Sequence, residues 1–130
     1  MIVIDASAVL EVLLRTPAAS SVEARLYQAG QTLHAPHLID VEVAQVLRRY
    51  AATNQIDAQR YRIALDDWLL FPVSRYSHEV LLPRVWDLRA NITAYDAVYV
   101  ALAEALDAPL ITRDGRLAGA FGHAAKIELV

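Results

Sequence analysis

A chain of 130 residues with 56% hydrophobic content, four glycines and five prolines is long enough for one compact domain, and this composition excludes a disordered chain. It contains no cysteine, which excludes disulfides and thiolate metal sites and fits a reducing compartment. The net charge of −3 excludes a global positive field that would attract nucleic acid. We expect no signal peptide, since Asp5 follows the first apolar residues at once, and no stretch approaches the ~18 apolar residues of a membrane span. The expected location is cytoplasmic.

The predicted elements alternate between strands and helices. The continuous apolar run at 2–5 is typical of a strand that is covered on both faces of a parallel sheet. Further strands are expected at 32–36, 71–77, 109–112 and 126–130. Helices are expected at 6–14, 17–29, 38–54, 57–70, 78–90, 93–108 and 114–121. This order predicts right-handed crossovers and an α/β fold, a three-layer α/β/α sandwich with a central parallel sheet, in which residues 1–130 form a single domain.

Four acidic residues lie where ligands bind in such a fold. Asp5 ends the first strand, and Asp114 comes two residues after the strand at 109–112. Asp96 lies in the first turn of its helix, and Glu42 lies near the start of another helix. Because strand carboxyl ends and helix N-termini gather at one edge of an open parallel sheet, these four side chains are expected to point to the same place.

Each acid also has a purely structural interpretation. Asp5 is a good N-cap for the helix that follows it. Thr93 and Asp96 have the spacing of a capping box. Asp114 precedes a glycine, as in many tight turns, and Glu42 could form a salt bridge to a nearby arginine. Taken singly, these alternatives remain open.

The four acids together favour a metal site. Asp96 stands on the helical stripe of Tyr99, Val100 and Ala103, which is expected to face inward. Converging carboxylates repel one another unless a divalent cation holds them. Mg²⁺ and Mn²⁺ take carboxylate and water oxygens, and such a site suits phosphoryl chemistry.

Four segments carry a resemblance to a known family. They are "VIDASAVL", "LIDVEVAQVLRR", "TAYDAVYVALAEAL" and "PLITRDGRLA". In this order they resemble the successive acidic motifs of the PIN-domain ribonucleases, in particular the VapC toxins of prokaryotic toxin–antitoxin pairs. The similarity spans nearly the whole chain, although the region 57–90 carries no motif.

The resemblance implies a Mg²⁺- or Mn²⁺-dependent endoribonuclease that inhibits translation or growth. A metal-bound water would attack the RNA phosphodiester and leave a 5′-phosphate. The implied catalytic and metal-binding residues are Asp5, Glu42, Asp96 and Asp114, with Ser7 and Thr112 as supporting hydroxyls. The implied partners are an RNA substrate, a cognate VapB-like antitoxin and a second copy of the chain in a homodimer.

Two arginines beside the last acid are candidates for RNA binding. Arg113 and Arg116 flank Asp114, and arginine is the better fork for phosphate oxygens. The alternative is that they are solvated surface charges. A subunit or antitoxin interface is predicted at the segment "DDWLLFP", which contains Leu69, because apolar residues are concentrated there.

Other polar residues are given no role in the site. His34 and His37 are three apart, but a proline between them breaks the helix that would align them, so we interpret both as loop or strand-edge residues. His78 and His123 are expected at the surface or half-buried. Asp40, two residues before the candidate site acid of its helix, is expected to face solvent.

Two rival functions remain. A phosphatase of the aspartyl-phosphate type needs a second aspartate where this chain has Ser7, and it needs a lysine near the site, whereas the only lysine is Lys126 in the last strand. The other alternative is a catalytically silent RNA- or protein-binding module of PIN fold. The presence of all four acids argues against a decayed site.

Overall fold

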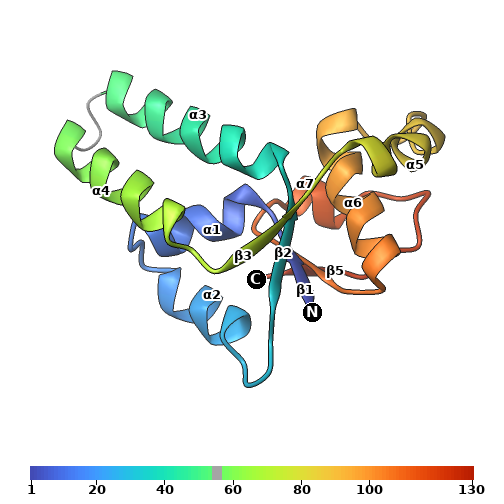
Figure 1. Cartoon of the computed structure of the whole chain (residues 1–130), viewed down its shortest axis with the longest axis horizontal. Coiled ribbons are helices and arrows are strands. Elements are labelled where there is room, and N and C mark those ends of the chain that lie inside the picture. The colour runs from blue at the N-terminus through green and yellow to red at the C-terminus, as the bar shows by residue number, and fades with distance from the viewer. Residues whose placement is uncertain (54–56) are drawn as a thin grey trace.

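A parallel sheet forms the centre of the molecule in the computed structural model, which describes residues 1–53 and 57–130 (Figure 1). Its strands in the described ranges are β1 (Ile2–Ile4), β2 (Leu33–Pro36), β3 (Val73–Tyr76), β4 (Leu110–Thr112) and β5 (Ile127–Leu129). Their spatial order is β3-β2-β1-β4-β5, and every neighbouring pair is parallel. The predicted parallel sheet is confirmed, and each strand is shorter than its predicted range.

The helices follow the predicted order with two corrections. They are α1 (Ala6–Leu13), α2 (Ala19–Leu26), α3 (Leu38–Ala52), α4 (Ala58–Leu69), α5 (Leu82–Asp87), α6 (Ala94–Leu106) and α7 (Gly115–Ala118). The predicted helix at 17–29 is too long at both ends. The predicted helix at 78–90 is instead a 3-10 turn, η1 (Glu79–Leu81), followed by α5, where Pro83 lies in the first turn because it has no N–H to donate. The predicted end of the third helix at Asn54 lies outside the described residues.

The helices cover both faces of the sheet. Figure 1 shows α1 to α4 on one side of the strands and α5 and α6 on the other. Helices α1 to α4 belong to the crossovers that lead from β1 through β2 to β3, whereas α5 and α6 belong to the crossover that runs back from β3 to β4. Because the crossovers are right-handed, this reversal of direction puts α5 and α6 on the opposite face. The three-layer α/β/α sandwich is therefore confirmed. Within the described ranges, no helix has both the length and the apolar composition needed to cross a membrane.

The core lies between the sheet and its helices. All three residues of β1 are buried, as the unbroken apolar run predicts. Helix α6 is buried along 97–103, so it packs on nearly all sides rather than along one stripe. Each large apolar side chain fully buried in this way contributes about 1.5–3 kcal/mol to folding. The core therefore fixes the ends of β1 and α6 relative to each other.

The strand order changes direction beside β1. From β1 the chain proceeds to β2 and β3 on one side, and it later returns to add β4 and β5 on the other side. The backbone N–H of Asp5 donates to the carbonyl of Ile111 at 3.2 Å, which ties the ends of β1 and β4 together. Open parallel sheets bind ligands beyond the strand ends at such a switch point. The fold thus places a candidate site next to Asp5.

Candidate active site

Asp5 is a buried carboxylate at the end of β1, with only 6% of its surface exposed. Its Oδ1 accepts hydrogen bonds from the hydroxyl of Ser7 at 2.7 Å and from the backbone N–H of Ala8 at 3.1 Å, while its Oδ2 accepts from the hydroxyl of Thr112. The bond from Ala8 makes Asp5 the N-cap of α1. Burial raises the pKa of Asp5, the hydrogen bonds oppose that rise, and the charge of Asp114 adds to it. Asp5 is therefore a cap and also a member of the acidic site.

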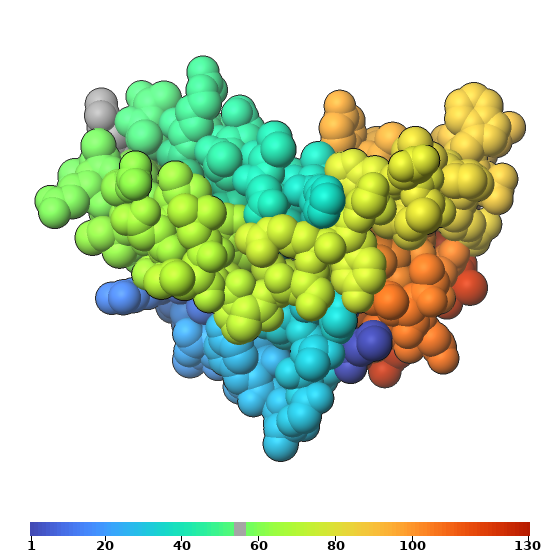
Figure 2. All heavy atoms as spheres, in the orientation of Figure 1, coloured from blue at the N-terminus to red at the C-terminus, as the bar shows by residue number. Residues whose placement is uncertain are grey.

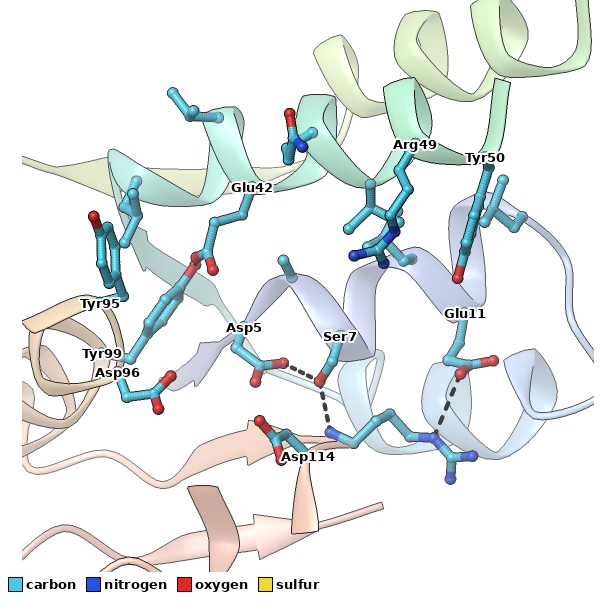
Figure 3. A pocket seen from close by; sticks show the side chains of 18 of the residues that line it. Asp5, Ser7, Glu11, Glu42, Arg49, Tyr50, Tyr95, Asp96, Tyr99 and Asp114 are labelled. Atoms are coloured by element: carbon cyan, nitrogen blue, oxygen red, sulfur yellow. Dashed lines mark hydrogen bonds and ion pairs between the residues drawn. The ribbon is translucent and has the colours of Figure 1, made fainter. Parts of the chain in front are cut away.

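The hydroxyls of Ser7 and Thr112 connect the start of α1 with the loop after β4, and Figure 3 shows Ser7 between Asp5 and that loop. Ser7 Oγ accepts from the backbone N–H of Arg113 at 2.9 Å, and Thr112 Oγ1 accepts from that of Asp114 at 2.9 Å. The two hydroxyl oxygens lie 3.3 Å apart. Both hydroxyls thus orient Asp5 and fix the loop that carries Asp114.

Glu42 faces the same site from α3, where it is half-buried (Figure 3). Its Oε1 accepts a hydrogen bond of 2.5 Å from the hydroxyl of Tyr99. Burial raises the pKa of Glu42, and the charges of Asp5 and Asp96 add to the rise, whereas the bond from Tyr99 lowers it. In the described part of the chain no arginine or lysine lies within ion-pairing distance of Glu42, so the alternative of a salt bridge is wrong.

Tyr99 is a site residue that the sequence reasoning placed only on the inward stripe of its helix. It is 2% exposed, and burial together with the charge of Glu42 raises its own pKa, so it stays a hydrogen-bond donor. It stands three residues after Asp96 on the same helix face. A buried tyrosine hydroxyl needs a polar partner, and this is the signal that could have found it.

Asp96 and Asp114 complete the group and share one cation. Arg116 Nη1 lies 2.8 Å from Asp96 Oδ2, and Arg116 Nη2 lies 3.1 Å from Asp114 Oδ2. Asp114 Oδ1 also accepts from two backbone N–H groups at the start of α7, which makes it an N-cap. Thr93 caps α6 by accepting from the N–H of Asp96 at 3.3 Å. Capping and site geometry again coexist.

The carboxylates of the site are the ligands that a hard divalent cation prefers, although they do not stand close enough together to coordinate one. Carboxylate oxygens from four elements face one place, and two of these carboxyls, Asp5 and Glu42, have pKa values raised by burial and by neighbouring charge. Within residues 1–53 and 57–130, no three acidic or histidine side chains are grouped closely enough to hold a metal ion as they stand. The Arg116 guanidinium places a positive charge between Asp96 and Asp114.

Both arginines predicted to bind RNA are engaged within the chain. Arg116 contacts the acids, whereas Arg113 Nη1 donates to the backbone carbonyl of Val130, and its Nε lies 3.7 Å from Glu11 Oε1. The side chain of Arg116 is 66% exposed, and that of Arg113 is 37% exposed. A role toward RNA therefore requires these internal contacts to be exchanged.

Asp40 is partly exposed to solvent, as expected, since 43% of its side chain is accessible, but its carboxylate is also bound within the chain. Its Oδ1 accepts from the indole Nε1 of Trp68 at 2.8 Å, and both of its oxygens lie 2.9 Å from Arg75 Nε. Arg75 in turn lies over the Trp68 ring, 4.9 Å from the centroid. Asp40 therefore joins α3 to α4 and β3, because the buried indole N–H requires an acceptor.

The histidines have structural roles. His34 is buried inside β2, where its ring nitrogens lie 2.8 Å from the hydroxyls of Thr32 and Tyr76, so it is not at a strand edge. His78 Nε2 accepts from the backbone N–H of Leu38 at 2.9 Å, which satisfies the start of α3. His78 and His123 are half-buried, as predicted.

A groove of about 550 Å³ encloses the acidic site and extends beyond it. Its walls come from α1, α3, the start of α6 and the loop after β4. All four acids line it, together with Ser7, Arg113 and Arg116. The structure thus brings the predicted site residues to one groove, with Thr112 directly behind Asp5.

The sequence of the chain matches a family model described as the PIN domain over residues 2–121, a range that includes all the elements of the groove. The chain belongs to the PIN-domain family. Ribonuclease VapC9 of Mycobacterium tuberculosis is 48% identical over 117 residues, which cover 90% of this chain and 88% of that protein. Ribonuclease VapC12 of the same organism is 45% identical over 130 residues, covering 100% and 99%. The resemblance to VapC ribonucleases is thereby confirmed.

A solved structure supports the PIN fold independently of close sequence similarity. The crystal structure of VapBC2 from Rickettsia felis bound to a DNA fragment from their promoter matches with a TM-score of 0.73 at 14% identity. The match covers 100% of this chain and 99% of that chain. At this low sequence identity the match shows the shared fold alone.

Proposed function

We propose that this PIN-domain protein is a VapC-type endoribonuclease that hydrolyses RNA phosphodiester bonds and acts as the toxin of a toxin–antitoxin pair. The observation that carries the proposal is the convergence of Asp5, Glu42, Asp96 and Asp114 on one groove at the β1–β4 switch point. The similarity to VapC9 and VapC12 over nearly the whole chain supports the same activity. Residues 1–130 act as one domain in this proposal, because one hydrophobic cluster connects the sheet with the helices.

The proposed cofactor is Mg²⁺ or Mn²⁺, held by carboxylates of Asp5, Glu42, Asp96 and Asp114. Such an ion supplies a more acidic water and neutralises charge that develops on the phosphate. The protein's own contribution is orientation. Ser7 and Thr112 orient Asp5 and favour its charged form against the effect of burial by donating to its oxygens, and Tyr99 does the same for Glu42.

Arg116 has the second cationic role in the proposed mechanism. In the structure it neutralises Asp96 and Asp114, which would otherwise repel each other across the groove. If a bound divalent ion compensates the charges of Asp96 and Asp114, the Arg116 side chain, which is 66% exposed, is free to contact a phosphate oxygen of the substrate. No side-chain nucleophile is required, and the proposed products carry a 5′-phosphate.

The proposed partners are a VapB-like antitoxin and a second copy of the chain, and the proposed location is the cytoplasm. The VapBC2 neighbour is a toxin–antitoxin complex by its title, which supports the first partner. The second is supported by Leu69, Leu70 and Trp86, which are 68%, 85% and 66% exposed and leave apolar surface uncovered.

The test is cleavage of total cellular RNA by the purified protein with Mg²⁺, with Mn²⁺ and with EDTA, followed by sequencing of the new 5′ ends. The proposal predicts discrete cuts that require the metal and disappear in Asp96→Asn. Stable binding of RNA without any cleavage under these conditions would instead favour a catalytically silent binding module.

A further inference from the structure

Helix α3 presents two different faces, and only one belongs to the core. Its core face consists of Ile39, Val43 and Leu47, which are all at most 5% exposed. The groove face repeats at helical spacing beside it. It consists of Leu38, Val41, Glu42, Gln45, Val46, Arg49 and Tyr50. The groove is therefore built along the length of α3 and not only around Glu42.

The end of the groove distant from Glu42 has a different chemistry. Arg49 and Tyr50 point from α3 into this end, opposite α1 (Figure 3). Leu10 of α1, Leu14 at its C-cap and Val46 of α3 also line the groove. This end therefore combines Arg49 with apolar side chains, and the carboxylate of Glu11, which faces Tyr50 there, is paired with Arg113, whereas the other end carries the four site acids (Figure 3). The notch that Figure 2 shows between the start of α3 and the α5–α6 side belongs to the opposite, acidic end of the groove.

Arg49 differs from the two arginines of the acidic end. Its guanidinium carbon lies 5.7 Å from the centre of the Tyr50 ring, and in the described part of the chain no carboxylate lies within ion-pairing distance of it. Arg113 and Arg116, in contrast, are each paired with acids. Arg49 is also solvent-exposed, so its charge is available to a ligand. An uncompensated guanidinium in a groove favours an anion with oxygen acceptors.

The spacing between the two ends indicates which part of a substrate Arg49 would meet. Glu42 and Arg49 are seven residues apart, two helical turns, which is a rise of about 10 Å. This separation exceeds the reach of a single phosphate group that is bound at the acids. A polyanion whose scissile phosphate lies at the acids would therefore place another of its phosphates near Arg49.

We propose that Arg49 and Tyr50 form a second nucleotide subsite, in which Arg49 binds a backbone phosphate and Tyr50, with Leu10, Leu14 and Val46, takes the face of an unpaired base. This inference rests on the proposed ribonuclease function and names its substrate class as single-stranded RNA. Base faces are available for such stacking only where the strand is unpaired. The combination of one free guanidinium with an aromatic ring is typical of single-strand binding grooves.

Single-turnover cleavage of a fluorescein-labelled single-stranded RNA in Mn²⁺ tests the subsite. Arg49→Gln should raise the enzyme concentration that gives the half-maximal rate by roughly tenfold. A plot of the logarithm of this concentration against the logarithm of the salt concentration should become shallower by about 0.7, the value for one phosphate contact on a single strand. The maximal rate should change less than twofold, because Arg49 does not touch the reacting phosphate. Tyr50→Leu should raise the same concentration by at least roughly fivefold, and Tyr50→Phe should not.

Arg48→Gln is the matched control, since Arg48 is also exposed on α3 but does not line the groove. Arg49→Lys should restore the salt slope without fully restoring binding, because lysine keeps the charge but not the planar fork. If wild type cleaves RNA and Arg49→Gln behaves as Arg48→Gln does, the subsite is refuted while the ribonuclease function stands. If wild type does not cleave at all, the proposed function itself fails. Equal effects of Arg49→Gln on single-stranded RNA and on the same RNA annealed to its complement would refute the single-strand assignment.

Discussion

Arg116 Nη1 lies 2.8 Å from Asp96 Oδ2, so the cation that bridges the acidic site comes from the chain itself. The same guanidinium lies 3.1 Å from Asp114 Oδ2. A divalent ion and this guanidinium need the same carboxylate oxygens. A divalent ion bound by Asp96 and Asp114, as proposed, would therefore displace this contact.

Replacing Arg116 by glutamine should strengthen Mn²⁺ binding. The Arg116 side chain is 66% exposed, so water screens its attraction to the acids, and the expected gain is at most about fivefold in affinity. Titration calorimetry on RNA-free protein measures it directly. Arg113→Gln is the control, because Arg113 pairs with Glu11 rather than with the site acids. Weaker Mn²⁺ binding in Arg116→Gln would mean that the arginine organises the site instead of competing for it.

Tyr99→Phe should shift the pH dependence of metal binding upward. The hydrogen bond from Tyr99 lowers the pKa of Glu42, which burial already raises, so its loss lets that pKa rise further. A carboxylate must be deprotonated to bind metal, and the variant should therefore require a higher pH for half-maximal Mn²⁺ binding. Affinity at pH 7 should fall roughly tenfold, a usual cost of removing an outer-shell partner. Identical pH profiles for wild type and variant would remove Tyr99 from the site.

Asp40→Ala should destabilise the fold without altering metal affinity. The change leaves the indole N–H of Trp68, which is 1% exposed, without its acceptor, and the expected loss is about 1–3 kcal/mol in the free energy of unfolding. Urea denaturation measures the loss. Asp66→Ala is the matched control, because Asp66 only pairs with Arg62 on an exposed helix face, and its loss should be below about 0.5 kcal/mol.

Leu69→Asp should separate subunits while leaving the fold intact. Leu69 is 68% exposed, so an aspartate at this position is solvated in the free chain and meets the cost of burial only in an interface. Size-exclusion chromatography should show a dimer for wild type and a monomer for the variant, with equal melting temperatures. Phe121→Asp, at another exposed apolar position, should leave the size unchanged. A variant of unchanged size would place the dimer contact elsewhere.

Much of the fold is readable from local sequence patterns. The apolar run of β1 and the capping residues Asp5 and Thr93 are short-range signals, and the structure places the corresponding elements as predicted. The helix at 78–90 was predicted less well, because the pattern alone did not separate η1 from the helix that Pro83 begins.

The candidate site was predictable only up to the identities of its acids. Switch-point logic brings Asp5 and Asp114 together, since both follow strands. The partners of those acids depend on long-range packing. The contacts of Tyr99 with Glu42 and of Asp40 with Trp68 join elements that are far apart in the chain, and no periodicity indicates them. The Arg116 bridge requires the start of α7 to face the start of α6, which is likewise a tertiary property.

The most direct test of the account is Asp5→Asn, measured by melting curves with and without Mn²⁺ beside one RNA cleavage assay. Asparagine caps a helix about as well as aspartate, so capping of α1 is retained while one buried charge is removed. Asp57→Asn is the matched control, because Asp57 caps α4 in the same way at an exposed position that does not line the groove. The comparison therefore separates the cap from the metal site.

The account predicts that metal-free Asp5→Asn is at least as stable as wild type, because the cost of burying a charge is removed and repulsion from Asp114 is relieved. Stabilisation by Mn²⁺, about 2.7 kcal/mol for wild type at 100 times its dissociation constant, should largely disappear, and cleavage should be lost. Asp57→Asn should keep both. If Asp5→Asn retains the full Mn²⁺ stabilisation and normal cleavage, Asp5 is only a helix cap, and the metal-dependent site proposed around it is wrong.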